Sequence, residues 1–127
     1  MNLRHRYAII TIRTLFGLLL IALGIMGLFV PPPTEGLSEA QLAAIQGLDA
    51  LGIATFIALV ELVAGLLIVT NYLPAFGALL VAPIFVGIIV YHLVKDPATI
   101  LPGVIVAALN IYLAYAYWDK YKALFVR

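Results

Sequence analysis

Residues 51–94 read LGIATFIALVELVAGLLIVTNYLPAFGALLVAPIFVGIIVYHLV, and this stretch decides the fold. It contains two apolar runs, each long enough to cross a bilayer, separated by a tight turn signal at Asn71–Pro74. Lipid offers no hydrogen-bond partner to the backbone, so segments of this kind form helices. The stretch therefore predicts two antiparallel membrane-spanning helices joined by a short turn.

Apolar runs of similar length lie on both sides of this stretch. Hydrophobic residues make up 65% of the chain and charged residues only 10%, which is too apolar for a soluble domain of 127 residues. We expect four spans, at about residues 7–30, 51–70, 74–94 and 100–118, within a single domain that covers residues 1–127. The predicted fold class is an all-α membrane protein, a four-transmembrane-helix antiparallel bundle.

The loop before the second span has a helix signal of its own. Ser38 and Gln41 have the spacing of a capping box, in which each side chain bonds the backbone N–H of the other. One interpretation is a short extracytoplasmic helix between helices 1 and 2, ended by a bend at Gly47 or Gly52. The other is a long second helix that begins at Ser38.

Basic residues are distributed unevenly along the chain. The two terminal segments carry six of the seven Lys and Arg residues, namely Arg4, Arg6, Arg13, Lys120, Lys122 and Arg127. The loop at residues 31–50 carries Glu35, Glu39 and Asp49 and no basic residue. Because positively charged loops stay on the cytoplasmic side, we expect a multi-pass protein with both termini in the cytoplasm.

Composition excludes several classes of function. A net charge of +1 without a basic stripe argues against nucleic-acid binding. The chain has no cysteine, which excludes disulfides and thiolate metal sites within it. It also has no nucleophile–base pair, no phosphate-binding glycine loop and no metal-ligand set. We therefore predict no metal, no cofactor and no catalytic activity of the isolated chain.

Four polar side chains within or beside the spans are the candidate site residues: Glu61, Arg13, Asn110 and His92. Each is costly to place in lipid and needs a partner. We expect Arg13 and Asn110 to be partners of Glu61 in a buried polar network. The alternative is a functional site, either a proton relay or a contact to a quinone or another lipophilic ligand. His92 lacks a second histidine at a suitable depth for a metal or haem site.

Small residues and one proline bear on how the helices pack. Gly17, Gly24 and Gly27 recur along the first span, where they allow close helix contact. Pro83 in the middle of the third span predicts a kink, because proline cannot donate the helical hydrogen bond.

Several marks along the chain, taken in order, resemble the DoxX-like family of small four-helix bacterial membrane proteins. They are Arg13 followed by Gly17, Glu61 followed by Ala64-Gly65-Leu66-Leu67, Ala82-Pro83, His92 before Asp96-Pro97, and the closing YAYWDKY at residues 115–121. The resemblance implies a bacterial inner-membrane location. It also implies a non-catalytic subunit or scaffold of a membrane complex, with a membrane protein partner or a homo-oligomer. The alternative that it implies is a redox-associated subunit that binds a quinone or another lipophilic ligand between helices.

Overall fold

The computed structural model describes residues 3–127, and every regular element in this range is a helix. The four long helices are α1 (Leu3–Phe29), α3 (Ile53–Val69), α4 (Pro74–Lys95) and α5 (Leu101–Ala116). The short ones are α2 (Glu39–Ala50), η1 (Pro97–Thr99), α6 (Trp118–Tyr121) and η2 (Lys122–Phe125). The predicted all-α class is confirmed.

Two helices, α1 and α4, are each long and apolar enough to cross a membrane. The helices α3 and α5 have only 17 and 16 residues. Each is long enough to cross a membrane only when it is counted together with the bent helix beside it. The structure therefore has between two and four candidate spans. Pro83 does not interrupt α4, which is one helix from Pro74 to Lys95.

The helix α2 is separate from α3 and makes an angle of 75° with it. The bend falls at Gly52, whose φ of 72° is a left-handed conformation that glycine adopts at little cost. The capping box is present: Ser38 Oγ accepts from the Gln41 N–H, and Gln41 Oε1 accepts from the Ser38 N–H. A short helix before the second span is confirmed, and the long second helix is wrong because Gly52 breaks it.

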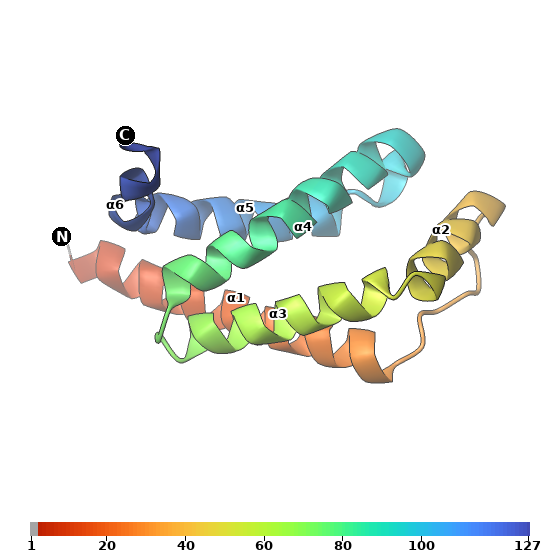
Figure 1. Cartoon of the computed structure of the whole chain (residues 1–127), viewed down its shortest axis with the longest axis horizontal. Helices are drawn as coiled ribbons and strands as arrows, with labels where there is room; N and C mark the ends of the chain where they lie inside the picture. The colour runs from red at the N-terminus through yellow and green to blue at the C-terminus, as the bar shows by residue number, and fades with distance from the viewer. Residues whose placement is uncertain (1–2) are drawn as a thin grey trace.

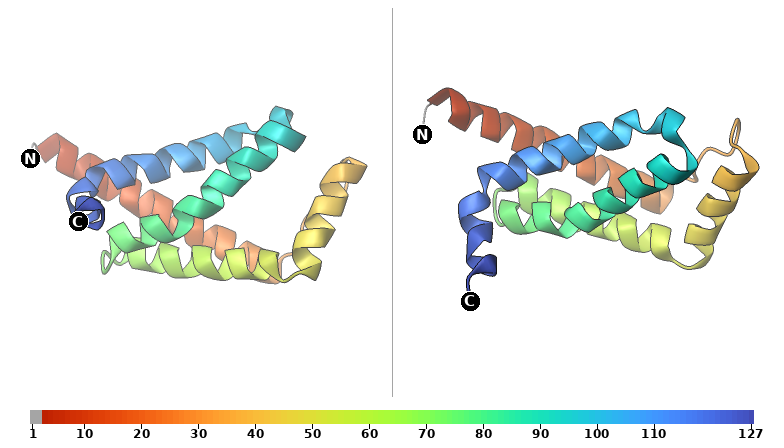
Figure 2. Two further views of the ribbon diagram at one scale, coloured as in Figure 1. Left: turned by 45° about the horizontal axis from the view of Figure 1, so that its top comes forward. Right: turned by 90° about the horizontal axis from the view of Figure 1, so that it is seen from above.

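The long helices form two pairs that diverge toward one end. Figure 1 shows α1 beside α3, and α4 beside α5, with the pairs close at the end that carries both termini. At the other end α2 turns from the start of α3 toward the far end of α4, as the left view of Figure 2 also shows. The molecule therefore has a closed end with the termini and an open end with α2.

The helices α1 and α3 are in close backbone contact. A Cβ atom added to Gly65 would lie 2.8 Å from the Gly17 carbonyl oxygen, and one added to Gly24 would lie 2.8 Å from the Ala58 carbonyl oxygen. A real Cβ atom would overlap the neighbouring helix at these distances, so the two backbones can lie this close only because these residues are glycines. The expected role of Gly17 and Gly24 in helix contact is confirmed.

The buried core lies where the four long helices meet. Its fully buried members include Phe16 of α1, Ile68 of α3, Val81 of α4 and Leu113 of α5. The Phe16 and Phe85 rings meet edge to face, with centroids 5.9 Å apart. All four long helices therefore contribute to one core.

We expect Gly65→Ala to lower the free energy of unfolding by about 1–3 kcal/mol, because the new methyl group overlaps the backbone of α1. The matched control is Gly87→Ala in α4, where an added Cβ meets nothing within 4 Å. It should cost nothing, since alanine is the better helix former. Thermal unfolding in mild detergent measures both, and equal stability of the two variants would contradict the α1–α3 contact.

Candidate functional site

The four polar side chains that the sequence singles out do not form one cluster. Glu61 and Asn110 are buried, with 7% and 6% of their surface exposed. Arg13 and His92 are half-buried. Each of the four has a different environment, and only Glu61 lacks a hydrogen-bond partner among the described residues.

Arg13 is tied to the turn between α3 and α4. One of its terminal nitrogens, Nη1, donates a 2.8 Å hydrogen bond to Asn71 Oδ1. Asn71 has a φ of 58°, a left-handed conformation that asparagine tolerates better than most residues. The Nε atom of Arg13 is buried and has no partner in the described part of the chain. Arg13 thus fastens α1 to the turn at the closed end.

The expected contact between Arg13 and Glu61 is absent from residues 3–127, and the register of α1 against α3 explains why. Gly17 packs against Gly65 and Val69. Because α1 and α3 are antiparallel, residues earlier in α1 than Gly17 lie beside residues later than Val69. Arg13 therefore lies beside Asn71. Glu61 is ten residues away from that position, about 15 Å along the helix. The arginine side chain does not bridge this distance.

Asn110 holds α5 against α4. Its Nδ2 donates a 2.9 Å hydrogen bond to the Ala78 carbonyl oxygen. The partner of Asn110 is therefore the α4 backbone and not Glu61, which the sequence suggests. This carbonyl lies one residue before Leu79, whose own helical partner would be the missing N–H of Pro83. A buried amide bonded across two helices fixes their register. The geometry of Asn110 is that of a packing residue.

A polar cluster at the open end joins α2 to the link between α4 and α5. Gln41 Nε2 donates to Asp96 Oδ2 at 2.5 Å, and Thr99 Oγ1 donates to the same carboxylate oxygen. His92 Nδ1 lies 3.2 Å from the Asp96 carbonyl oxygen and 3.2 Å from Thr99 Oγ1. Because that carbonyl only accepts, Nδ1 carries a proton toward it, which leaves Nε2 as the ring nitrogen outside this cluster.

Next to this cluster lies a cavity of about 540 Å³ between α2 and α4, which we call the α2–α4 groove. Its apolar lining includes Ile45 and Leu48 of α2, Ile57 of α3, and Ile84 and Ile88 of α4. Its polar lining consists of Gln41, Tyr91, His92 and Asp96. The groove therefore has an apolar body and one polar end, the form of a site for an amphipathic molecule.

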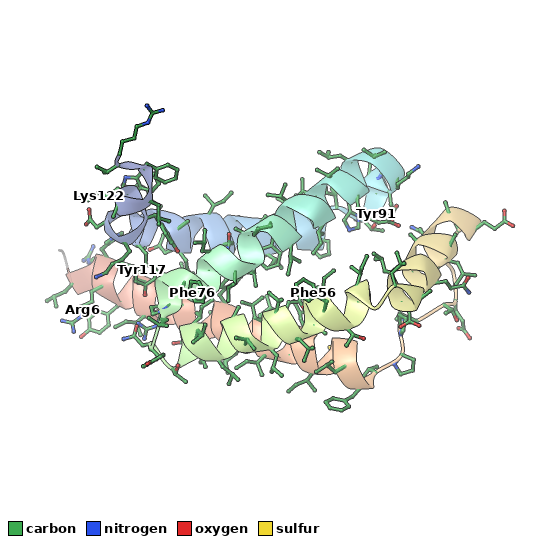
Figure 3. All side chains as sticks on the ribbon, viewed as in Figure 1. Arg6, Phe56, Phe76, Tyr91, Tyr117 and Lys122 are labelled. Carbon is green, nitrogen blue, oxygen red and sulfur yellow. The ribbon has the colours of Figure 1, made fainter. Side chains whose placement is uncertain are left out.

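Gly87 opens the middle of this groove. It lines the wall on α4, and a Cβ atom built there would meet nothing within 4 Å. Figure 3 labels Tyr91, one turn further along α4, near the end where α2 lies. The sequence indicates that Gln41 belongs to a helix cap and that Asp96 ends a helix. It does not indicate that these two residues, 55 positions apart, form a hydrogen bond with each other.

Within the described range, no group of three or more His, Asp or Glu side chains is placed to hold a metal ion. No protein-family model, curated protein or solved structure matches the chain. The resemblance to the DoxX-like family therefore stays a prediction, and the geometry of the groove carries the functional argument.

We expect a double-mutant cycle to separate the observed contact of Arg13 from the one that the sequence predicts. Arg13→Leu and Asn71→Gly should couple by about 0.6–1.7 kcal/mol, the range of interhelical hydrogen bonds in membranes. Arg13→Leu and Glu61→Leu should add to within about 0.5 kcal/mol, because they share no contact. Glycine keeps the left-handed φ at position 71. Coupling above about 1 kcal/mol between Arg13 and Glu61 would show that the two side chains pair after all.

Proposed function

We propose that this chain is a four-span integral membrane protein that binds an amphipathic lipophilic molecule in the α2–α4 groove. The observation that carries the proposal is an apolar cavity with one polar end that still has unused hydrogen-bonding groups. A quinone, or another ring with polar substituents and an apolar tail, has the matching chemistry. In this proposal the chain acts as a binding subunit of a membrane complex.

The four-span arrangement is supported by the shape of the molecule. The helices α1, α3, α4 and α5 run alternately between the closed end and the open end (Figure 1). Taken together, each bent pair, α2 with α3 and α5 with α6 and η2, has the length and composition of one span. In the proposed arrangement α3 and α5 cross the membrane, and the bent helices lie at their ends. In this arrangement α2 lies near the outer membrane surface, with its polar side toward water.

The orientation is supported by charge. The six basic residues of the terminal segments belong to the closed end, and the acidic Glu35, Glu39, Asp49 and Asp96 belong to the open end. By the positive-inside rule the closed end faces the cytoplasm, and the groove opens near the outer leaflet. A lipophilic ligand would then enter from the membrane rather than from the cytoplasm.

The polar end of the groove suits a head group that both donates and accepts hydrogen bonds. Nε2 of a neutral His92 can accept, while the Tyr91 hydroxyl and one of the two Gln41 Nε2 hydrogens can donate. The volume of about 540 Å³ is within the range of roughly 300–1,000 Å³ typical of small-molecule sites. These features support a ring-sized head group.

A subunit role fits the same site. The DoxX-like resemblance implies a subunit or scaffold of a bacterial inner-membrane complex or, as the alternative, a redox-associated subunit that binds a quinone or another lipophilic ligand. The groove favours the alternative. The simpler role of a scaffold, in contact with a partner protein or with a second copy of the chain, makes no use of the groove. Ligand binding therefore separates the two roles.

For topology, we expect a C-terminal fusion to alkaline phosphatase to be inactive and a fusion at Gly36 to be active. The reason is that Gly36 lies in the link between α1 and α2 at the open end, whereas the C-terminus is at the closed end. A C-terminal fusion to green fluorescent protein should fluoresce. An external C-terminus would overturn both the four-span topology and the proposed orientation.

For ligand binding, we expect Gly87→Phe to abolish the binding of lipophilic molecules that co-purify with the protein in mild detergent. The phenyl ring would enter the groove without displacing the backbone, because the space beyond Gly87 is open. Gly87→Ala should retain most of the ligand and is the matched control. Mass spectrometry of organic extracts identifies and quantifies the bound molecules.

The same preparation distinguishes a ligand-binding subunit from a scaffold. If wild type and Gly87→Phe carry the same lipids and quinones in the same amounts, the groove is not the binding site. If neither carries a ligand while crosslinking in membranes gives one discrete heteromeric product with both, the scaffold role replaces the proposal.

A further inference from the structure

The closed end has a second cavity, independent of the α2–α4 groove. It has a volume of about 550 Å³ and lies between the start of α4 and the segment formed by α6 and η2. Apolar side chains of Phe76, Leu79 and Leu124 line part of it. The lining also includes Tyr72, Tyr117 and Lys120, whose side chains carry two hydroxyls and an ammonium. Like the groove, this cavity combines an apolar surface with a polar mouth.

One wall of this cavity is the α6–η2 segment, which is held in a fixed position beside α4. The segment Trp118–Phe125 bends away from α5 by 70°. It is fastened to α4 by Tyr121, whose hydroxyl donates a 2.5 Å hydrogen bond to the Ala75 carbonyl oxygen. The Trp118 ring stacks on Phe125, with centroids 5.8 Å apart. A segment with this bend and these aromatic residues is suited to lie along a membrane surface.

The two lysines of this segment differ in their partners. Lys122 Nζ forms a 2.7 Å ion pair with Asp119, and this bond holds the pKa of the Asp119 carboxyl below its usual value. Lys120 lines the cavity and is in no ion pair of the described residues, although its charge also contributes to lowering the pKa of Asp119. The cavity lining thus includes a lysine whose ammonium can bind a further anion.

Charge complementarity indicates the occupant. The closed end contains six of the seven basic residues of the protein and one acidic residue of its own, Asp119, which is already paired. We propose that the cavity between α4 and the α6–η2 segment binds an anionic phospholipid. Its phosphate lies against Lys120 and the two tyrosine hydroxyls, and an acyl chain lies along Phe76, Leu79 and Leu124. Lipid in the leaflet next to the closed end supplies both parts of this ligand.

The only tryptophan of the chain provides the measurement. Trp118 lines a neighbouring cavity that shares Leu79, Tyr121 and Leu124 with the proposed site. Brominated acyl chains bound in the site should therefore quench its fluorescence. The full-length protein is reconstituted in phosphatidylcholine vesicles, and brominated phosphatidylglycerol or brominated phosphatidylcholine is added in increasing mole fraction. We expect half-maximal quenching at a mole fraction about fivefold lower for phosphatidylglycerol, the effect of one lysine near an anionic head group.

The variants test the site rather than the general charge of this end. Lys120→Gln should remove the preference for phosphatidylglycerol, and Lys120→Arg should keep it. Lys122→Gln removes the same charge two residues away and should also keep it, because Lys122 is bound to Asp119. Excess inorganic phosphate should not restore fluorescence, since the apolar part of the site requires an acyl chain.

Three outcomes would overturn the proposal. The first is equal quenching of the wild type by the two lipids. The second is an equal loss of preference in Lys120→Gln and Lys122→Gln, which would indicate surface charge alone. The third is displacement of the lipid by inorganic phosphate. If Lys120→Gln unfolds in detergent, Tyr117→Phe replaces it and should weaken the preference, because one donor to the phosphate is lost.

Discussion

The close approach of α1 to α3 is the constraint on which the rest of the structure depends. Gly17 and Gly65 bring two backbones into direct contact, and Gly24 and Ala58 do so again two turns further along. Contacts of this kind allow only one register between the helices. That register places Arg13 against the α3–α4 turn and leaves Glu61 without a cation. The surroundings of Arg13 and Glu61 therefore follow from the packing of small residues between α1 and α3.

Where the two helix pairs diverge, at the open end, they leave space between them instead of packing closely. At the open end α1 and α3 no longer meet α4 and α5, and α2 covers the opening (Figure 2). The bend at Gly52 and the Gln41–Asp96 hydrogen bond hold α2 in place from its two ends. A short amphipathic helix fixed in this way makes a cavity wall, which explains why the groove combines residues from α2 and α4.

Much of the fold could be predicted from the sequence because its signals are local. Apolar runs, prolines and the Ser38–Gln41 capping box gave the helices and the separate α2. The candidate site was predictable only in part, since its pairings depend on register. Arg13 was expected to bond Glu61, but the glycine contacts place it beside Asn71. The hydrogen bond between Gln41 and Asp96 could not be predicted either. Each residue already has a local role, Gln41 in the capping box of α2 and Asp96 at the end of α4, and neither role indicates a distant partner.

The unequal lengths of the helices have a consequence for the surrounding lipid. The α1 helix has 27 residues and a rise of about 40 Å, whereas α5 has 16 residues and a rise of about 24 Å. A typical hydrocarbon core is about 30 Å thick, so in the proposed four-span arrangement α1 would tilt to fit it and the bilayer would be thinner beside α5. The annulus of lipid around a single molecule would then be thinner on one side than on the other. Such hydrophobic mismatch would favour thinner membranes.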